Sequence, residues 1–433
     1  MFTGQEIETS QKRIVNIHLL SSQIRKSLQH IRQEGLGSFL KILDRRLKSS
    51  RSLLTKPDIE YAYRFLWCTP AVQVPDVSLA QGQRSINWYI PAIGKGSGGH
   101  LNIFRFMKYL ERNGFTSRVI VVDDESPLSI AKVKAQISQW FGMEIADVRY
   151  VKEGVPSAAI SIATSWQTAY ALRNLQALTH KCYFVQDYEP WFYPAGSEYA
   201  LAEQTYHFGF EGFTAGGWLA GKLADEFGMP TLALGFSYDR ALYSPAPSAQ
   251  RPASKRVFFY VRPPTARRAF DLGVLVLAEL NRRVPDLTVV VAGWDVRHYA
   301  LPFRCEHAGL LDPSELARLY GSCDAALVLS FSNLSLLPLE IMACGVPVVS
   351  NRAACTEWLL TDDIAVLARP TVEDLTGALE KVLSSADLAM QLSTDALAFA
   401  AATDWDAEGE KMAVRLRTLL VDATTATEID APA

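Results

Sequence analysis

Cysteines are few in this sequence, and none of them forms a C-x-x-C pair. Six are scattered over 433 residues: Cys68, Cys182, Cys305, Cys323, Cys344 and Cys355. That distribution argues against a zinc site or a disulfide framework, and it is typical of reduced thiols in the cytosol. An apolar run of about 18 residues, long enough to span a membrane, is missing as well.

Two further absences narrow the class of protein. The start of the chain, MFTGQEIETSQKR, lacks the apolar core of a signal peptide. A net charge of -3 gives no excess of basic residues, so we expect no nucleic-acid partner. We therefore expect a cytoplasmic protein that is either soluble or peripheral on the inner face of the cell membrane. With 49% hydrophobic and 21% charged residues it should be globular, and its length favours two domains.

Residues 1–80 differ from the rest of the chain. Between Lys12 and Lys56 there are eleven Lys or Arg residues against Glu34 and Asp44. Apolar residues recur there at helical spacing: Ile17, Leu20, Ile24, Leu28 and Ile31. This pattern predicts a basic, helical N-terminal extension. Residues 12–56 would either lie on an anionic membrane surface or pack on the enzyme with a solvated basic face.

From residue 81 onward, short apolar runs alternate with helical stretches. Such alternation predicts parallel sheets covered by helices on both faces. A linker rich in Pro, Ser and Ala, Ser237 to Lys255, interrupts the pattern, which then restarts. We therefore predict an α/β protein with two Rossmann-like, doubly wound domains facing across a cleft. Their ranges are 81–243 and 244–403, followed by a helix over 404–421 that packs back on the first domain and a disordered tail over 423–433.

The stretch from Tyr89 to Asp124 reads as strand, glycine-rich turn, helix and strand. Gly94, Gly96 and Gly99 have the G-x-G-x-x-G spacing of dinucleotide-binding proteins, and Asp123 follows near the end of the next strand. Taken alone, this spacing is a weak signal. A nicotinamide enzyme is therefore one hypothesis, and the second half of the chain tests it.

A cationic site is predicted just after the first strand of the second domain. In FFYVRPPTARRAF, Arg262 follows the strand, while Arg267 and Arg268 open the next helix. Cations at the carboxyl end of a strand, beside the free N–H groups of a helix start, form an anion site. The alternative is that these arginines are ordinary surface residues.

Two more segments of the second domain carry candidate ligand contacts. In SFSNLSLLPLEIMACGVPVVSN, a polar turn precedes a helix that should begin near Leu334, and Glu340 is the only charged residue between Asp324 and Arg352. A carboxylate in so apolar a segment needs hydrogen-bond partners, which are either ribose hydroxyls or a buried arginine. In HAGLLDPSELARLYG, the loop with Leu310 and Leu311 either contacts the flat base of a nucleotide or is an ordinary β-loop-α connection.

These three segments, in this order, resemble the donor domain of retaining GT-B glycosyltransferases of family 4, and within them the rhamnosyltransferase-like branch of bacterial surface-glycan assembly. The likeness covers about residues 85–420 and is strongest from 257 to 352. It implies that Arg262 and Arg267, with Arg268 as the second choice, neutralise the leaving diphosphate, and that Glu340 holds the ribose. It also implies further donor contacts at Gly98, Gly99, Leu310, Leu311, Asn333, Leu334 and Ser335.

One position departs from the family. Most members carry a second glutamate eight positions before Glu340, where it meets hydroxyls of the donor sugar, and this sequence has Ser332. The departure favours a deoxysugar donor such as dTDP-rhamnose. The resemblance also explains the glycine-rich loop without nicotinamide, because GT-B enzymes begin their first domain with such a loop facing the cleft.

The other dense site is YFVQDYEPWFYPAG in the first domain. Asp187 follows a strand there, so it should project from the carboxyl edge of the sheet and orient the acceptor or assist its deprotonation. Aromatic neighbours suit the apolar side of a sugar ring, so we assign acceptor binding to Tyr188, Glu189 and His100. The alternative is an aspartate that caps an aromatic core cluster.

The sequence thus predicts a retaining, metal-independent hexosyltransferase that needs no cofactor beyond its nucleotide-diphosphate sugar. Its acceptor would be a glycan or a lipid-linked glycan. Asp123 and Asp124 look like a metal-binding pair, but the arginines make a cation unnecessary. Two alternatives stay open: a nucleotide-sugar epimerase of the same fold, which acts without an acceptor, and a non-catalytic glycan- or nucleotide-binding protein.

Overall fold

The structure is a computed structural model that describes residues 58–72, 84–122, 128–177, 179–245, 254–309 and 311–429, with the backbone alone over 422–429. The chain divides into two compact units, residues 1–64 and 65–433. The described part of the first unit holds helix α3 (Ile59–Ala62), capped by the Asp58 carboxylate, which accepts the Tyr61 amide at 2.9 Å. Residues 12–56 lie outside the described residues, so their membrane contact stays a prediction.

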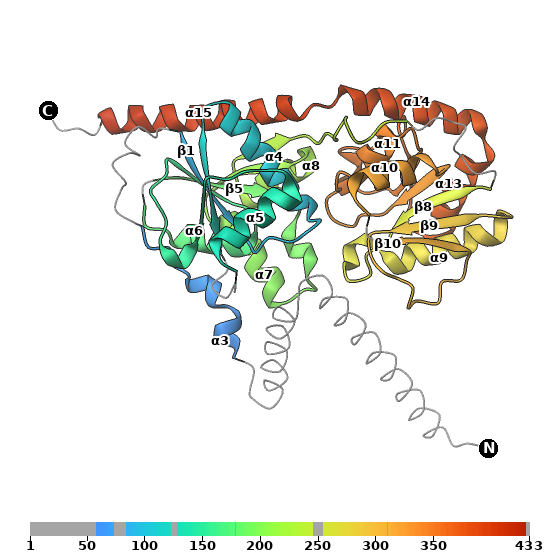
Figure 1. Cartoon of the computed structure of the whole chain (residues 1–433), viewed down its shortest axis with the longest axis horizontal. Coiled ribbons are helices and arrows are strands. Elements are labelled where there is room, and N and C mark those ends of the chain that lie inside the picture. Colours follow the sequence, from blue (N-terminus) through green and yellow to red (C-terminus); the bar gives the residue numbers. More distant parts are fainter. Residues whose placement is uncertain are drawn as a thin grey trace, which may run out of the picture. The chain divides into compact units, whose positions relative to one another are not determined.

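The second unit contains two parallel sheets, as predicted (Figure 1). The first has seven strands in the order β3-β2-β1-β4-β5-β6-β7. Their bounds are β1 Ser85–Ile90, β2 Thr116–Val121, β3 Asp147–Tyr150, β4 Ile160–Ala163, β5 His180–Val185, β6 Glu211–Ala215 and β7 Thr231–Leu234. The order reverses between β1 and β4, where Trp88 lies opposite Val119 on one side and Ile162 on the other.

The second sheet has six strands in the order β10-β9-β8-β11-β12-β13. Their bounds are β8 Arg256–Tyr260, β9 Thr288–Ala292, β10 Cys305–Gly309, β11 Ala325–Val328, β12 Val348–Asn351 and β13 Val366–Ala368. All neighbouring strands of this sheet pair in parallel, and the order reverses between β8 and β11. Ligands of doubly wound sheets bind at the carboxyl ends of the strands near such reversals.

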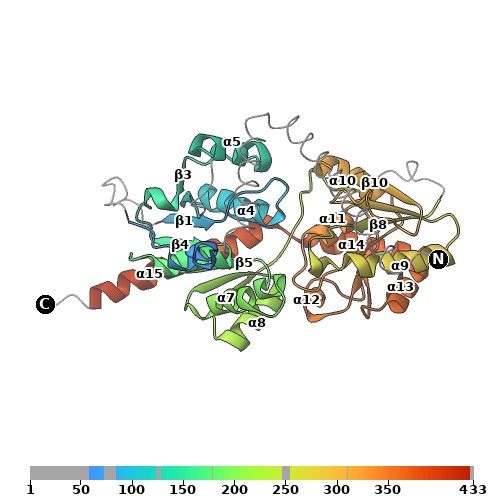
Figure 2. The same cartoon turned by 90° about the horizontal axis from the view of Figure 1, so that it is seen from below.

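Helices cover both faces of the sheets, as the turned view in Figure 2 shows. Those of the first domain are α4 Gly98–Arg112, α5 Ile130–Phe141, α6 Trp166–Asn174, α7 Ser197–Gln204 and α8 Gly217–Phe227. Those that follow are α9 Phe270–Arg283, α10 Pro313–Gly321, α11 Leu337–Ala343, α12 Ala354–Glu357, α13 Val372–Ser384, α14 Ala386–Ala402 and α15 Trp405–Ile429.

Helix α4 illustrates how the sequence sets these elements. The Ser97 hydroxyl accepts the His100 amide and so caps the helix start. Its apolar side chains recur at helical spacing and face the sheet, and Ile103, Met107 and Leu110 are almost fully buried. The helix ends where Gly114 takes a positive φ of 84°.

The last helix packs on the first domain. Met412, Ala413 and Leu416 of α15 are fully buried in the core of the first sheet. Tyr109 of α4 donates a hydrogen bond to Glu410 at 2.9 Å. Helix α15 continues to Ile429, and so it reaches into the segment for which we expected a disordered tail.

The chain crosses twice between the two sheets, and the crossings are bonded to each other. The first follows β7, and the second joins α14 to α15. The Thr403 hydroxyl donates to Ser237 at 2.9 Å, and the Arg240 guanidinium donates to the Ala401 carbonyl at 2.9 Å. Among the described residues, no helix is both long enough and apolar enough to cross a lipid bilayer.

The two sheet-bearing domains approach closely at Gly216, between β6 and α8. Gly216 has φ 89° and ψ 163°, a conformation that only glycine adopts readily. A Cβ atom there would lie 2.6 Å from the ring of Trp358, which follows α12. The contact therefore requires glycine on two independent grounds.

We expect Gly216→Ala to lower the free energy of unfolding by about 2–5 kcal/mol, because backbone strain and overpacking add. Urea denaturation of the full chain measures this. Gly217→Ala is the control, since a Cβ there meets no atom within 4 Å. It should change stability by less than about 0.5 kcal/mol. Equal losses in the two variants would contradict the role assigned to the Trp358 contact.

Candidate active site

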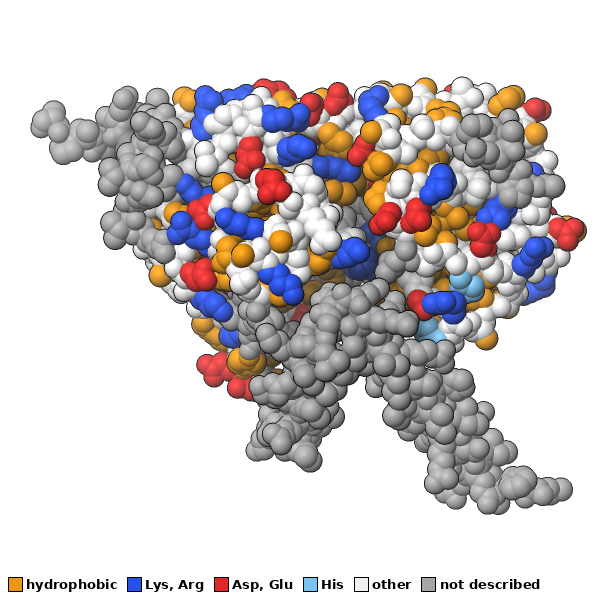
Figure 3. All heavy atoms as spheres, viewed as in Figure 1, with side chains coloured by type: hydrophobic (Ala, Val, Ile, Leu, Met, Phe, Trp, Pro, Cys, Tyr) orange, Lys and Arg blue, Asp and Glu red, His pale blue; other side chains and the backbone are white. Residues whose placement is uncertain are grey.

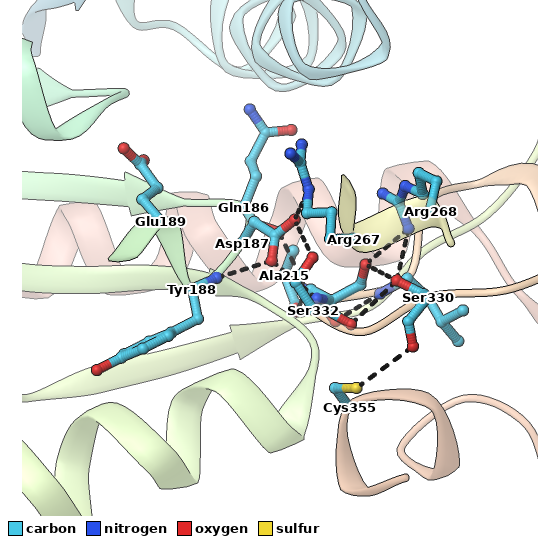
Figure 4. A network of polar contacts seen from close by, with 12 residues as sticks. Gln186, Asp187, Tyr188, Glu189, Ala215, Arg267, Arg268, Ser330, Ser332 and Cys355 are labelled. Atoms are coloured by element: carbon cyan, nitrogen blue, oxygen red, sulfur yellow. Dashed lines mark hydrogen bonds and ion pairs between the residues drawn. The ribbon is translucent and has the colours of Figure 1, made fainter. Parts of the chain in front are cut away.

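Three polar segments meet where strands of the two sheets end (Figure 4). Gln186 and Asp187 follow β5 of the first sheet. Arg267 and Arg268 belong to η7 (Ala266–Arg268), a short 3-10 helix after β8 of the second sheet. The turn Ser330–Asn333 follows β11. The sequence places each of these segments at a carboxyl edge, and the structure brings them together.

The Asp187 carboxylate lies between the domains and is bound as an anion. It accepts the Ser332 hydroxyl at 3.0 Å and the amides of Asn333 and Tyr188 at 2.8 Å each. Burial raises the pKa of Asp187, and the positive charges of Arg268 and Arg267 act in the opposite direction. We expected Asp187 to project from the carboxyl edge of the sheet into the cleft. Its carboxylate instead contacts the turn Ser330–Asn333 of the second domain.

Arg267 is held by two groups of the first domain. Its Nε atom lies 3.4 Å from an Asp187 oxygen, and its guanidinium carbon lies 3.8 Å from the centre of the Phe192 ring. Its terminal nitrogens make no hydrogen bond with any described residue. The guanidinium therefore keeps donor capacity for a ligand such as phosphate.

The other two arginines differ in their surroundings. Arg268 donates to the Ser330 hydroxyl at 2.6 Å and to the Asn333 carbonyl at 3.2 Å, so it supports the turn. Ser330 is fixed in addition by Asn351, whose side chain pairs with the Ser330 backbone at 2.9 and 2.8 Å. Arg262 is exposed, and its guanidinium donates a hydrogen bond to the Tyr260 hydroxyl at 3.5 Å. Arg262 and Arg267 are thus more accessible than Arg268.

Asn333 joins the two domains through two of its four side-chain hydrogen bonds. Its amide nitrogen donates to the carbonyls of Gln186 at 3.0 Å and Ala215 at 2.6 Å, both in the first domain. Its amide oxygen accepts Trp358 Nε1 at 2.7 Å and its neighbouring backbone amide, Leu334, at 3.0 Å. Asn333 is fully buried, and its polar atoms are satisfied within the protein.

These bonds revise the predicted donor contacts of the turn. The backbone amides of Asn333 and Leu334, which we expected to contact the phosphates, are occupied by Asp187 and by the Asn333 side chain. Helix α11 begins at Leu337 rather than near Leu334. Ser335 lies at the entry of that helix, where its hydroxyl accepts the Leu337 amide at 3.4 Å.

Glu340 lies in the first turn of α11 and is half-buried. Burial raises its pKa to about 7, while the positive charge of Arg105 and a hydrogen bond with Tyr243 act in the opposite direction. Arg105 belongs to α4 of the first domain, so this carboxylate also faces the other domain. Sequence reasoning missed Arg105, although a cation placed between Phe104 and Phe106 was a usable signal.

The glycine-rich loop contacts the end of β5 through Gln186. The Gln186 amide donates to the Gly99 carbonyl at 3.0 Å and accepts Asn102 at 3.2 Å. Gly98 is exposed at the helix start. His100 is buried beside Ser97, whose hydroxyl lies 2.8 Å from its Nδ1, and burial lowers the pKa of the ring.

Two predicted acceptor residues point into the first domain instead. The Glu189 carboxylate accepts the Trp166 amide at 2.7 Å and the Tyr183 hydroxyl at 3.0 Å. Tyr188 is almost fully buried and donates to Glu203 at 2.8 Å. The structure therefore does not bring either side chain to the site, because both satisfy buried polar partners. The exposed aromatic residues of this segment are Trp191 and Phe192.

Other predicted features lie outside the described residues or remain open. Leu310, Asp123 and Asp124 are not among the described residues, and Leu311 precedes α10. Within the described ranges, no cluster of three or more His, Cys, Asp or Glu side chains is arranged to hold a metal ion. On the face in Figure 3, basic and acidic side chains are interspersed rather than gathered in one patch.

Two family models match the chain, one in each domain. The WsaF N-terminal domain matches residues 86–212, and the WsaF C-terminal domain matches residues 255–380. Together these matches cover more than half of the chain.

One relative and two solved structures are also similar to this chain. The O-antigen biosynthesis protein RfbC of Myxococcus xanthus is 33% identical over 336 residues, which are 75% of this chain and 26% of that protein. The chain therefore spans about a quarter of that relative. Sucrose-phosphate synthase from Thermosynechococcus elongatus superposes with a TM-score of 0.62 at 14% identity, over 78% of this chain and 100% of the other. HepE from Anabaena, in complex with UDP and glucose, superposes with a TM-score of 0.61 at 15% sequence identity, over 77% of this chain and 100% of HepE. These likenesses show the fold.

The buried Glu189 should make stability depend on pH. Burial raises its pKa to about 7 from an ordinary value of 4.5. Between these values the native state binds more protons than the unfolded chain, so stability falls as the pH rises. Relative to Glu189→Gln, the free energy of unfolding of the wild type should fall by up to about 1.4 kcal/mol per pH unit as the pH rises from about 5 to 7. Urea denaturation across this range measures the free energy of unfolding.

The control is Glu198→Gln, an exposed change on α7, which should show the same pH dependence as the wild type. Parallel curves for the wild type and Glu189→Gln would contradict the assignment.

Asn333→Ala should loosen the domain contact as well as destabilise the fold. The substitution leaves the carbonyls of Gln186 and Ala215 without their donor, which should lower the free energy of unfolding by about 2–4 kcal/mol. The control is Asn174→Ala, because the Asn174 amide also donates to two carbonyls, Leu66 and Cys68, but within one domain. Small-angle scattering should show a larger radius of gyration for Asn333→Ala alone. An unchanged radius for both variants would refute the joining role of Asn333.

Proposed function

Because the chain belongs to the WsaF family and has the GT-B fold, we propose that it is a glycosyltransferase of surface-polysaccharide synthesis. It would move a sugar from a nucleotide-diphosphate donor to a glycan or lipid-linked glycan acceptor. The O-antigen assignment of the Myxococcus relative supports this substrate class. The UDP complex of the Anabaena neighbour supports a nucleotide donor.

The observation that carries the proposal is the placement of three ionic side chains at the carboxyl edge of the second sheet. Arg262 follows β8 and is exposed, and Arg267 has terminal nitrogens without a described partner. Glu340 stands at the start of α11 with its carboxylate half-buried. The arginines suit a diphosphate, and the carboxylate suits the hydroxyls of a ribose.

The chemical step that we propose is retaining transfer. Arg262 and Arg267 stabilise the charge that develops on the diphosphate as the sugar–oxygen bond breaks. The acceptor hydroxyl attacks the same face of the oxocarbenium-like sugar, and its proton passes to the departing phosphate oxygen. Two cationic side chains at the leaving group support a reaction without metal.

The donor sugar that we propose is a deoxyhexose, with dTDP-rhamnose as the first candidate. A glutamate at position 332 would offer a carboxylate to sugar hydroxyls, whereas Ser332 donates its own hydroxyl to Asp187 at 3.0 Å.

A thermal-shift panel of dTDP-, UDP- and GDP-sugars tests the donor class. The preferred donor at about 100 times its dissociation constant should add about 2.7 kcal/mol of stability. Calorimetry should then show at least about tenfold weaker binding for Arg262→Ala and for Glu340→Ala, since each removes a charged contact.

The matched control for these variants is Arg297→Ala. Arg297 is an exposed arginine of the same domain that pairs with Asp295 at 2.9 Å. Its removal should leave the affinity unchanged. Unaltered donor binding in Arg262→Ala and Glu340→Ala would show that the site is placed wrongly. Conversion of the donor without an acceptor would indicate an epimerase instead.

A further inference from the structure

We propose that Phe192 of the first domain is a positioning residue for Arg267 of the second. Its ring supports the guanidinium from across the domain boundary, so that the cation is aligned for the donor diphosphate only when the two domains meet. The inference rests on the proposed function, because it takes Arg267 as a diphosphate contact.

The turn that carries Phe192 also carries Asp187. Asp187 precedes η4 (Glu189–Phe192), a 3-10 turn in which Pro190 restricts the backbone and the Trp191 amide donates to the Tyr188 carbonyl at 3.1 Å. Arg267 contacts the carboxylate of Asp187 and the ring of Phe192, at 3.4 Å and 3.8 Å. One turn of the first domain therefore supplies both a charge and an aromatic face to the same guanidinium.

The second domain fixes the backbone of Arg267. The Arg267 carbonyl accepts the Phe331 amide at 2.9 Å, which ties η7 to the turn after β11. The residue that ends η7, Ala269, has a positive φ of 47°, so this short segment has a defined path. An arginine side chain has several rotatable bonds beyond its backbone, and those are the ones that the first domain restrains.

Phe192 itself is 37% exposed, whereas Glu189 and Pro190 of the same turn are buried. Burial therefore does not explain why a large apolar ring lies at a polar domain boundary. The stacked guanidinium at 3.8 Å explains it, because a cation over an aromatic face is attracted to the ring and keeps its N–H groups free at the edge.

The test is a double-mutant cycle on binding of a nucleoside diphosphate to the full chain. The probe is whichever of dTDP, UDP and GDP stabilises the wild type most, and calorimetry gives the dissociation constants. Phe192→Ala should weaken binding about fivefold, whereas Phe192→Trp, which keeps an aromatic face, should stay within about twofold of the wild type. In an Arg267→Ala background, Phe192→Ala should have no further effect.

The matched control is Trp191→Ala. Trp191 is the adjacent residue, is similarly exposed, and stacks on Trp218 rather than on Arg267. Its removal should leave diphosphate affinity unchanged. If Trp191→Ala and Phe192→Ala weaken binding equally, or if Phe192→Ala and Arg267→Ala act additively, the positioning role is refuted.

The outcomes separate this inference from the proposed function. Binding that depends on Arg267 but not on Phe192 overturns the inference alone and leaves the donor site in place. Binding that depends on neither arginine, Arg262 or Arg267, overturns the proposed site. Failure of all three diphosphates to bind the wild type overturns both.

Discussion

The arrangement of the site depends on a buried anion at the boundary between two sheets. The Asp187 carboxylate belongs to the first domain, but outside its own turn it accepts hydrogen bonds from the Ser332 hydroxyl and the Asn333 amide of the second. Asn333 returns two hydrogen bonds to first-domain carbonyls. Because each domain satisfies polar groups of the other, neither edge is complete alone. The arginines at this boundary balance a charge that would otherwise be costly to bury.

The same boundary would allow these residues to hold an internal carboxylate and, as we propose, a diphosphate. Groups that bind an internal carboxylate are chemically suited to bind a phosphate as well, since both are oxyanions recognised by guanidinium and N–H donors. Arg268 is committed to the turn, whereas Arg267 makes one ion pair and keeps its terminal nitrogens available among the described residues. Under the proposed function, Arg268 gives structural support and Arg267 is the arginine left to recognise a ligand.

Much of the fold could be predicted from the sequence, and the failures have physical causes. Central strands such as VFFY and TVVVA are continuous apolar runs, which indicate a parallel sheet. Strands β3 and β10 are harder to predict, because they are edge strands whose side chains are only partly buried. The position of Asp187 at a strand end was predictable, but its bond to Asn333 was not, because 146 residues separate them. Glu189 looked like a ligand contact because a buried hydrogen-bonded carboxylate and a catalytic one have the same sequence context.

The paired crossings of the chain limit how the two domains can move. The segment after β7 and the junction of α14 with α15 are bonded through Thr403 with Ser237 and through Arg240 with Ala401. Two covalent connections fastened at one place act as a single pivot. Sliding of one sheet past the other would stretch a connection, while rotation about the pivot would not. We therefore expect any opening of this molecule to be a rotation about this pivot, in which the residues farthest from Thr403 travel the greatest distance.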